Sequence, residues 1–195
     1  MEHFEIVYSG TRAEVYAPFH PEFVAALKRA GGRWDLQKRA WIVSAAAVDT
    51  IRAKMRAIYG RDDTEEPKRV DVRLTFTSSL YKSCGPIFLL GKEVARATGR
   101  DSGAKIGADA CFTAGAPTSG GSAKNWYTCI KEGSVCILAG VPESMAVKDN
   151  LPEGVELEII QSSSVDREAL EAERKKLLDR LAEIDAILGH EAVKN

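Results

Sequence analysis

The sequence predicts an α+β protein: a small ββαββα module, then a small antiparallel β-barrel or sandwich, and finally a C-terminal amphipathic helix. Three changes in periodicity predict it. Apolar residues recur at helical spacing in two stretches of the first 60 residues, the period changes to two from residue 70, and Leu and Ile recur every seven residues after residue 165. We therefore divide the chain into a first module (1–60), a polar linker (61–69), an all-β module (70–161) and a C-terminal helix (162–195).

The first module opens with two short alternating runs around a Ser-Gly-Thr turn, which indicates a strand–turn–strand unit. Pro21 suits the first turn of a helix, and Gly31-Gly32 ends that helix. A second helix is expected to begin after Ser44, as its cap, and to end at Gly60. The charge-dense stretch 61–69 lacks apolar periodicity, and we expect its acidic pairs to be solvated.

The stretch 31–43 carries the strongest functional indication. Trp34 and Trp41 flank a polar turn, so a hairpin would place them on neighbouring strands, with Arg33, Lys38 and Arg39 close by. Large rings and cationic groups on one small platform suit base stacking and phosphate contacts. The alternative is that both tryptophans belong to the core and the charges form a solvated rim.

A helix followed by G-G-R-W-D-x-x-x-R-x-W-I-V and a second helix resembles the HARP-like module of annealing-helicase-type proteins, related forms of which occur in phage- and plasmid-encoded proteins. The resemblance covers residues 1–60 and is carried by Arg33, Trp34, Asp35, Lys38 and Trp41. It implies a small α/β platform that engages DNA, especially at forks or single-strand junctions. The chain contains no G-x-x-x-x-G-K-[ST], so the resemblance does not extend to an ATP-driven motor.

In the second module an alternating run at 70–76 predicts a half-buried strand, and further strands are expected at 87–90, 94–98, 110–113, 126–130, 135–139 and 155–160. Two loops, 99–107 and 118–127, combine glycines with hydroxyls and a lysine, so their backbone amides could approach an anion. The second loop runs into Trp126 and Tyr127, which could stack a base. The alternative, favoured by how common Gly/Ser loops are in β proteins, is a flexible hairpin loop with Trp126 entering the core.

The C-terminal segment is helix-forming and charged. Leu170, Leu177 and Ile184 recur every seven residues, although Arg167 and Arg174 occupy the earlier complementary positions. An isolated helix of this length needs a partner to stay folded, and it either pairs with a copy of itself or packs on the β module. We favour a homodimeric coiled coil through 165–188.

The amino-acid composition and charge of the chain indicate a globular protein. Hydrophobic residues make up 45% of the 195 residues and charged residues 28%, which is typical of a globular protein, and no apolar run is long enough to cross a membrane. The first residues lack the pattern of a secretory signal, so we expect a cytoplasmic protein without membrane partners. The net charge of −1 gives no global attraction to nucleic acid. Cations are nevertheless in local excess, nine Lys/Arg against six Asp/Glu in residues 1–60 and seven against three in residues 81–131.

Side chains for metal binding or catalysis do not form a motif. The four cysteines include no C-x₂-C pair, and the three histidines are scattered along the chain, so we expect no metal and no cofactor. Cys129 and Cys136 could face each other across a hairpin, but in a cytosolic protein they are expected to be small buried hydrophobic residues. No nucleophile motif is present, and we therefore expect a protein that is not an enzyme.

The leading hypothesis is a nucleic-acid-binding accessory protein of mobile-element type, from a phage or plasmid, which binds single-stranded or forked DNA, or RNA. The residues expected to bind nucleic acid are Arg33, Trp34, Lys38, Arg39, Trp41, Lys92, Arg100, Lys105, Lys124, Trp126 and Tyr127. The alternative from another class is a protein-binding anti-defence inhibitor, for example an anti-CRISPR protein, that blocks a host nucleoprotein complex. A third hypothesis is that the glycine-rich loops capture a small phosphorylated ligand.

Overall fold

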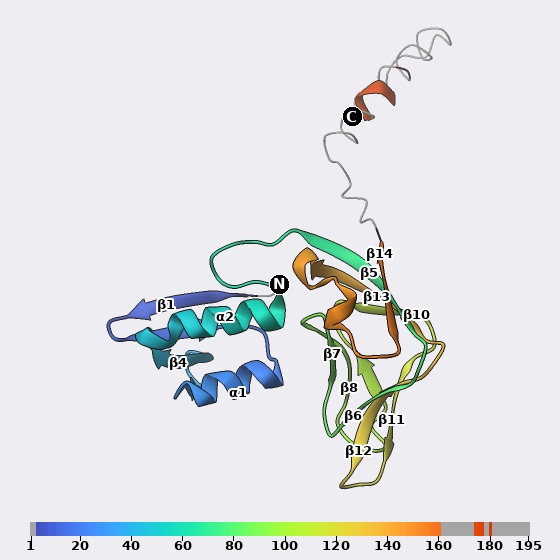
Figure 1. Cartoon of the computed structure of the whole chain (residues 1–195), viewed down its shortest axis with the longest axis horizontal. Helices are drawn as coiled ribbons and strands as arrows, with labels where there is room; N and C mark the ends of the chain where they lie inside the picture. Colours follow the sequence, from blue (N-terminus) through green and yellow to red (C-terminus); the bar gives the residue numbers. More distant parts are fainter. Residues whose placement is uncertain (1–2, 161–173, 178–179, 181–195) are drawn as a thin grey trace, which may run out of the picture. The chain divides into compact units, whose positions relative to one another are not determined.

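A computed structural model describes residues 3–160, 174–177 and 180 of the chain (Figure 1). Helices and several small antiparallel sheets are both present, which confirms the α+β class. The predicted coiled coil at 165–188 lies outside the described residues except for 174–177 and 180, which are helical. Among the described helices, none combines the length and the apolar run that a membrane crossing requires.

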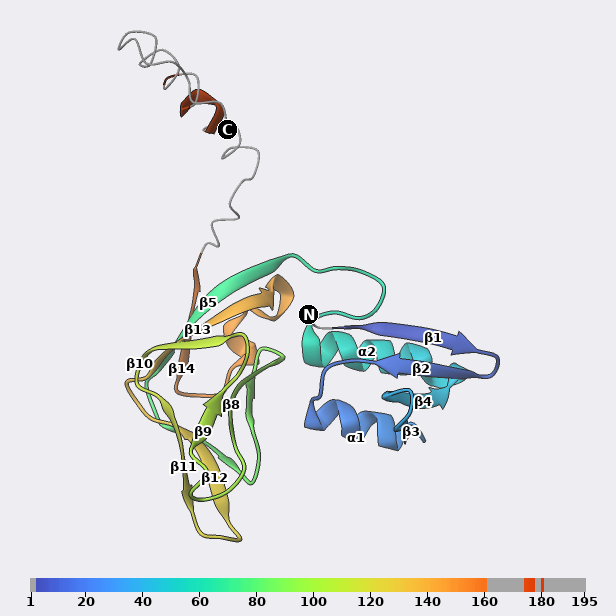
Figure 2. The same ribbon diagram turned by 180° about the vertical axis from the view of Figure 1, so that it is seen from behind.

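The first module has the predicted order ββαββα. Its elements are β1 (Glu5–Ser9), β2 (Arg12–Tyr16), α1 (Pro21–Arg29), β3 (Arg33–Asp35), β4 (Ala40–Ser44) and α2 (Val48–Tyr59). The four strands form one antiparallel sheet in the order β1-β2-β4-β3, and Figures 1 and 2 show the two helices running alongside it. The alternating and helical patterns of the sequence therefore predict the order of these elements correctly.

One face of this sheet is covered by the two helices. Ile6, Val15 and Val43 point to that side and share a core with Leu27 and Met55, two fully buried helical side chains. The burial of such side chains stabilises the module by about 1.5–3 kcal/mol each. Because side chains alternate along a strand, the intervening residues lie on the opposite face, which the helices leave open.

Local signals explain where α1 begins and ends. His20 precedes the helix, and its Nδ1 accepts a hydrogen bond from the Glu22 backbone N–H at 3.3 Å. At the other end Gly31 adopts a φ of +74°, which a residue with a side chain rarely adopts, and the Gly32 N–H donates to the Leu27 carbonyl at 2.8 Å. These contacts satisfy backbone groups that the end of a helix leaves free.

The start of the second helix was predicted wrongly. A short 3-10 turn (Ala45–Ala47) follows Ser44, and the Ser44 side chain makes no capping hydrogen bond. The α-helix begins only at Val48, after a residue without a capping side chain. Its end follows the prediction, because Gly60 closes it with a φ of +71°.

The stretch after α2 is not a solvated connector, contrary to the sequence-based interpretation. Asp63 forms a two-pronged ion pair with Arg52 of α2, with both N–O distances at 2.8 Å. Asp62 is buried and pairs with Arg56 of the same helix. This pairing and hydrogen bonds from Thr64 hold the pKa of Asp62 below its usual value, even though burial acts in the opposite direction. Asp62 and Asp63 therefore hold the start of the segment 61–69 against helix α2.

The second module consists of ten strands in three small antiparallel sheets. These strands are β5 (Arg69–Phe76), β6 (Leu80–Ser83), β7 (Ile87–Leu89), β8 (Lys92–Ala97), β9 (Ala104–Ile106), β10 (Ala110–Ala114), β11 (Pro117–Gly121), β12 (Trp126–Ile130), β13 (Val135–Pro142) and β14 (Val155–Ile160). The sheets have the orders β10-β13-β5-β14, β11-β12-β6 and β7-β8-β9. They share one hydrophobic core that includes Leu74, Phe76, Ile130 and Leu138. Within the described residues the sheets do not close into a barrel.

Parts of both predicted glycine-rich loops are strands. Residues 104–106 form β9, and residues 117–121 form β11, which pairs with β12 along its whole length. Cys129 and Cys136 are free and buried, as expected, but they do not face each other, because β12 pairs with β11 and β6 while β13 pairs with β10 and β5.

Candidate nucleic-acid interface

The tryptophan hairpin forms as predicted. Asp35 starts its turn, and its carboxylate Oδ1 accepts hydrogen bonds from the backbone N–H groups of Gln37 at 2.9 Å and Lys38 at 3.0 Å. Trp34 and Trp41 are direct cross-strand partners, with ring centroids 5.7 Å apart and an edge-to-face angle of 63°. The hairpin therefore places both rings on one face of the sheet.

The two tryptophans differ in exposure. Trp41 packs against the core of the first module, whereas the side chain of Trp34 lies at the edge strand and is 50% exposed. The core interpretation is therefore confirmed for Trp41 and wrong for Trp34. Trp41 supports the fold, and Trp34 packs edge-to-face on Trp41 with half of its surface exposed to solvent.

The cations predicted beside the rings do not share their face. Arg33 is adjacent to Trp34 in the strand and so points to the opposite side of the sheet. Lys38 forms an ion pair with Glu14, and this hydrogen bond lowers the pKa of Glu14 and raises that of Lys38. Arg39 has a left-handed φ of 52° and lines a different cavity. The predicted single platform of rings and cations is therefore split.

A cavity of about 650 Å³ opens at the end of the sheet where β3 begins. We call it the arginine notch, and its lining residues are Thr11, Arg12, Gly31, Arg33, Trp34, Asp35, Ile42, Val43 and Ser44. In the part of the chain that the structure describes, neither Arg12 nor Arg33 has an acidic side chain within ion-pair distance. The carboxylate of Asp35 already accepts the two turn amides. The notch thus carries two guanidinium groups without an ion-pair partner and one carboxylate, beside a half-exposed indole.

Strand register explains why the two arginines lie close together. Arg12 lies opposite Ser44, and Arg33 lies opposite Ile42, so all four occupy the open face of the sheet. The pairing of β3 with β4 starts only at Arg33, and β4 continues two residues past Ile42. The chain turns away there to the end of α1, and this leaves the edge of β4 uncovered.

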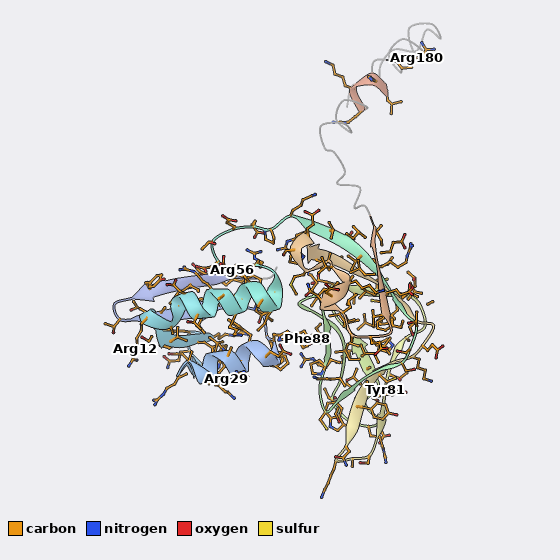
Figure 3. All side chains as sticks on the ribbon, in the orientation of Figure 1. Arg12, Arg29, Arg56, Tyr81, Phe88 and Arg180 are labelled. Carbon is orange, nitrogen blue, oxygen red and sulfur yellow. The ribbon has the colours of Figure 1, made fainter. Side chains whose placement is uncertain are left out.

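Arg12 was not recognised from the sequence. It lies 21 residues before Arg33 and starts a strand whose neighbours the sequence does not reveal. Figure 3 labels its side chain at the end of the first module. A signal was present in the strand–turn–strand pattern, but only the register β2-β4-β3 brings Arg12 to the notch.

Three of the seven cations predicted to contact phosphate are held by ion pairs. Lys92 is buried and its ammonium lies 2.7 Å from Asp109, while Arg100 pairs with its neighbour Asp101 at 2.7 Å. Lys38 is the third. The desolvation and pairing of Lys92 remove it from any phosphate contact.

The remaining predicted residues of the second module are exposed or half-exposed. Lys105 lies on β9, and Lys124 lies at the tip of the β11–β12 hairpin. Trp126 and Tyr127 are both half-buried and adjacent in β12, so they point to opposite faces of its sheet. One nucleic-acid strand on one face cannot stack on both.

No protein-family model, curated protein or solved structure matches this chain. The HARP-like resemblance therefore remains a prediction carried by the residues of the tryptophan hairpin. Within residues 3–160 and the short described helical stretch, no three His, Cys, Asp or Glu side chains converge where they could hold a metal ion.

Proposed function

We propose that the first module binds nucleic acid at the arginine notch. A base would stack on the exposed part of Trp34, and the flanking phosphates would contact Arg12 and Arg33. The observation that supports this proposal is one cavity at the edge strand β3, which is lined by a half-exposed indole from one face of the sheet and by two arginines without ion-pair partners from the other face. Base–aromatic stacking contributes about 1–3 kcal/mol per base, and guanidinium groups bind phosphate through two parallel hydrogen bonds.

The geometry favours an unpaired nucleotide. The faces of bases in a duplex are covered by their neighbours, so the Trp34 ring can stack only on a base that is free of the helix. A single strand or the junction of a fork offers such a base. We therefore propose single-stranded or forked DNA as the ligand. Single-stranded or forked RNA is the alternative ligand, and the test includes both.

The proposed activity is binding of nucleic acid, with no catalysed reaction. It makes the chain an accessory protein of a phage or plasmid that acts on nucleic acid in the cytoplasm, in line with the HARP-like resemblance. The nucleic acid is expected to be held mainly by phosphate contacts and stacking, both of which tolerate any base sequence.

The test is fluorescence anisotropy of labelled single-stranded, forked and duplex oligonucleotides titrated with the full chain at several salt concentrations. Arg12→Gln and Arg33→Gln should each weaken binding and reduce the slope of log K against log salt by about one. Trp34→Leu should weaken binding about tenfold at every salt concentration, with Trp34→Phe restoring part of it. The matched control is Arg73→Gln, because Arg73 lies on β5 and pairs with Glu158 at 2.6 Å.

Failure to bind any of these oligonucleotides at low salt would overturn the proposal. Binding that the three notch substitutions leave unchanged would overturn the assignment of the site. Binding of RNA in preference to DNA would retain the notch and change the ligand.

A protein-binding anti-defence role is a second candidate. The ion pairs of Lys38, Lys92 and Arg100 favour it, because they remove three cations from the predicted phosphate-binding set. It predicts that a host nucleoprotein complex is captured by the immobilised chain and stays bound after nuclease treatment. Loss of the captured proteins with nuclease would instead support direct binding to nucleic acid.

A further inference from the structure

A second aromatic surface lies on the β11-β12-β6 sheet. Tyr81 on β6 pairs in register with Cys129 on β12, two residues from Tyr127, so the two tyrosines lie on the same face. Their ring centroids are 5.3 Å apart and their planes meet at 81°. Tyr81, labelled in Figure 3, is 58% exposed.

This face is the outer face of the sheet. The opposite face carries Ile130, Thr128 and Leu80, and the core of the second module includes Ile130, with Leu80 packed against it. Thr128 is fully buried and ties the sheet to its surroundings, since its hydroxyl accepts from the Ala97 N–H at 3.0 Å and donates to the Gly85 carbonyl at 2.7 Å. The sheet that carries the two tyrosines is therefore held in place by the core and by these hydrogen bonds.

A glycine fixes the position of the inner ring. Gly120 lies opposite Tyr127, and a Cβ at this position would be 2.6 Å from the Tyr127 hydroxyl oxygen. Only glycine leaves room for the ring to lie across the hairpin. Tyr81 then stands against Tyr127 and presents more than half of its surface to solvent.

The charges around this sheet are unbalanced. Between residues 81 and 131 each acidic side chain is in an ion pair: Glu93 with Arg96, Asp101 with Arg100, and Asp109 with Lys92. The other four lysines in this range have no acidic partner among the described residues. They are Lys82, Lys105, Lys124 and Lys131. Residues 81–131 therefore present four lysines without ion-pair partners, and one exposed carboxylate, Glu132, follows directly after Lys131.

Two of these lysines bracket the tyrosine face. Lys124 lies at the hairpin tip two residues before β12, and Lys131 directly follows the last residue of β12. A polyanion that runs along β12 would pass a lysine, the tyrosine pair and a second lysine in that order. The other residues of the face are Ser83, Thr118, Gly120 and the buried Cys129, so the two tyrosines are its only aromatic side chains. No carboxylate lies on this face of the described strands, and the lysines at both ends of β12 therefore favour a polyanion as the ligand.

We propose that the outer face of the β11-β12-β6 sheet is a second binding site for single-stranded nucleic acid, separate from the arginine notch. Tyr81 stacks on one base, Tyr127 holds Tyr81 upright, and Lys124 and Lys131 contact the flanking phosphates. This second site rests on the proposed function, because it takes the same class of ligand as the arginine notch, but it shares no residue with the notch.

The experiment titrates the full chain with fluorescein-labelled oligo(dT) of increasing length and measures anisotropy. Tyr81→Ala should weaken binding of long oligo(dT) about tenfold, and Tyr81→Phe should restore most of it, because the stacking ring returns. Lys124→Gln should weaken binding and reduce its salt slope by about one. The matched control is Lys82→Gln, since Lys82 is next to Tyr81 in β6 but points to the opposite face.

Combination with the notch variant separates the two sites. Arg12→Gln/Arg33→Gln should retain a weaker affinity for oligo(dT) that is lost when Tyr81→Ala is added. If Tyr81→Ala and Lys124→Gln both bind as the wild type does, with unchanged circular dichroism, this second site is refuted while the notch stands. If only these two variants lose affinity and the notch variants do not, the second site stands and the notch is refuted. No binding by the wild-type chain refutes both.

Discussion

At the scale of single residues, Gly32 shows how closely the notch is packed beneath its surface. A Cβ on Gly32 would lie 2.7 Å from the Leu27 carbonyl oxygen and 3.1 Å from Val43 Cγ1. We expect Gly32→Ala to lower the free energy of unfolding by about 1–3 kcal/mol, because backbone and core must shift to admit the methyl group. Urea denaturation followed by tryptophan fluorescence measures the loss.

The control for this substitution is Gly99→Ala. A Cβ on Gly99 meets no atom within 4 Å, and its φ lies outside the left-handed region. We expect this variant to unfold at the same urea concentration as the wild type or slightly above it. Equal effects of the two substitutions would show that Gly32 is not confined by Leu27 and Val43.

At the scale of elements, the turn of the tryptophan hairpin depends on one carboxylate. Asp35 Oδ1 accepts the backbone N–H groups of Gln37 and Lys38. Asp35→Ala removes both hydrogen bonds and should destabilise the first module by about 1 kcal/mol, whereas Asp35→Asn keeps an acceptor at the same place and should cost less. Thermal unfolding of the three proteins checks this order. An alanine variant as stable as the asparagine variant would contradict it.

Elements could be predicted where the signal is local. The alternation of β5, the proline at the start of α1 and the glycines after it each act within a few residues, and each prediction was confirmed. β11 was missed because its sequence, PTSGG, contains no apolar alternation. It is a strand only because β12 supplies its hydrogen-bond partners. Pairing of that kind is a tertiary property, which local patterns do not record.

The candidate site was only partly predictable for the same reason. The hairpin and its two tryptophans follow from spacing, because the turn sets the register between neighbouring strands. Arg12 reaches the notch through the pairing of β2 with β4, and Lys92 is lost to the site through its ion pair with Asp109. Strand order and the choice of ion-pair partners depend on contacts between residues that are distant in the sequence.

At the scale of the whole molecule, His20 lies between an aromatic ring of the first module and one of the second. Its ring centroid lies 5.8 Å from that of Tyr59 in the first module and 4.3 Å from that of Phe88 in the second. Burial lowers the pKa of His20, while Glu22 acts to raise it and Lys82 to lower it further. The neutral imidazole is also the form whose Nδ1 can accept the hydrogen bond that caps α1.

Acid should therefore weaken the native state through this residue. Because the pKa of His20 is lower in the folded than in the unfolded chain, its contribution to stability is present above the unfolded pKa of about 6.5 and is lost as the pH falls towards the folded value. We expect the midpoint of urea unfolding to fall between pH 7.5 and 5.5, and to fall less in His20→Asn, which retains a capping acceptor without titrating. His3→Asn is the control, since His3 is exposed beside Glu5. If the unfolding midpoint of His20→Asn depends on pH as that of the wild type does, then protonation of His20 does not destabilise the native state.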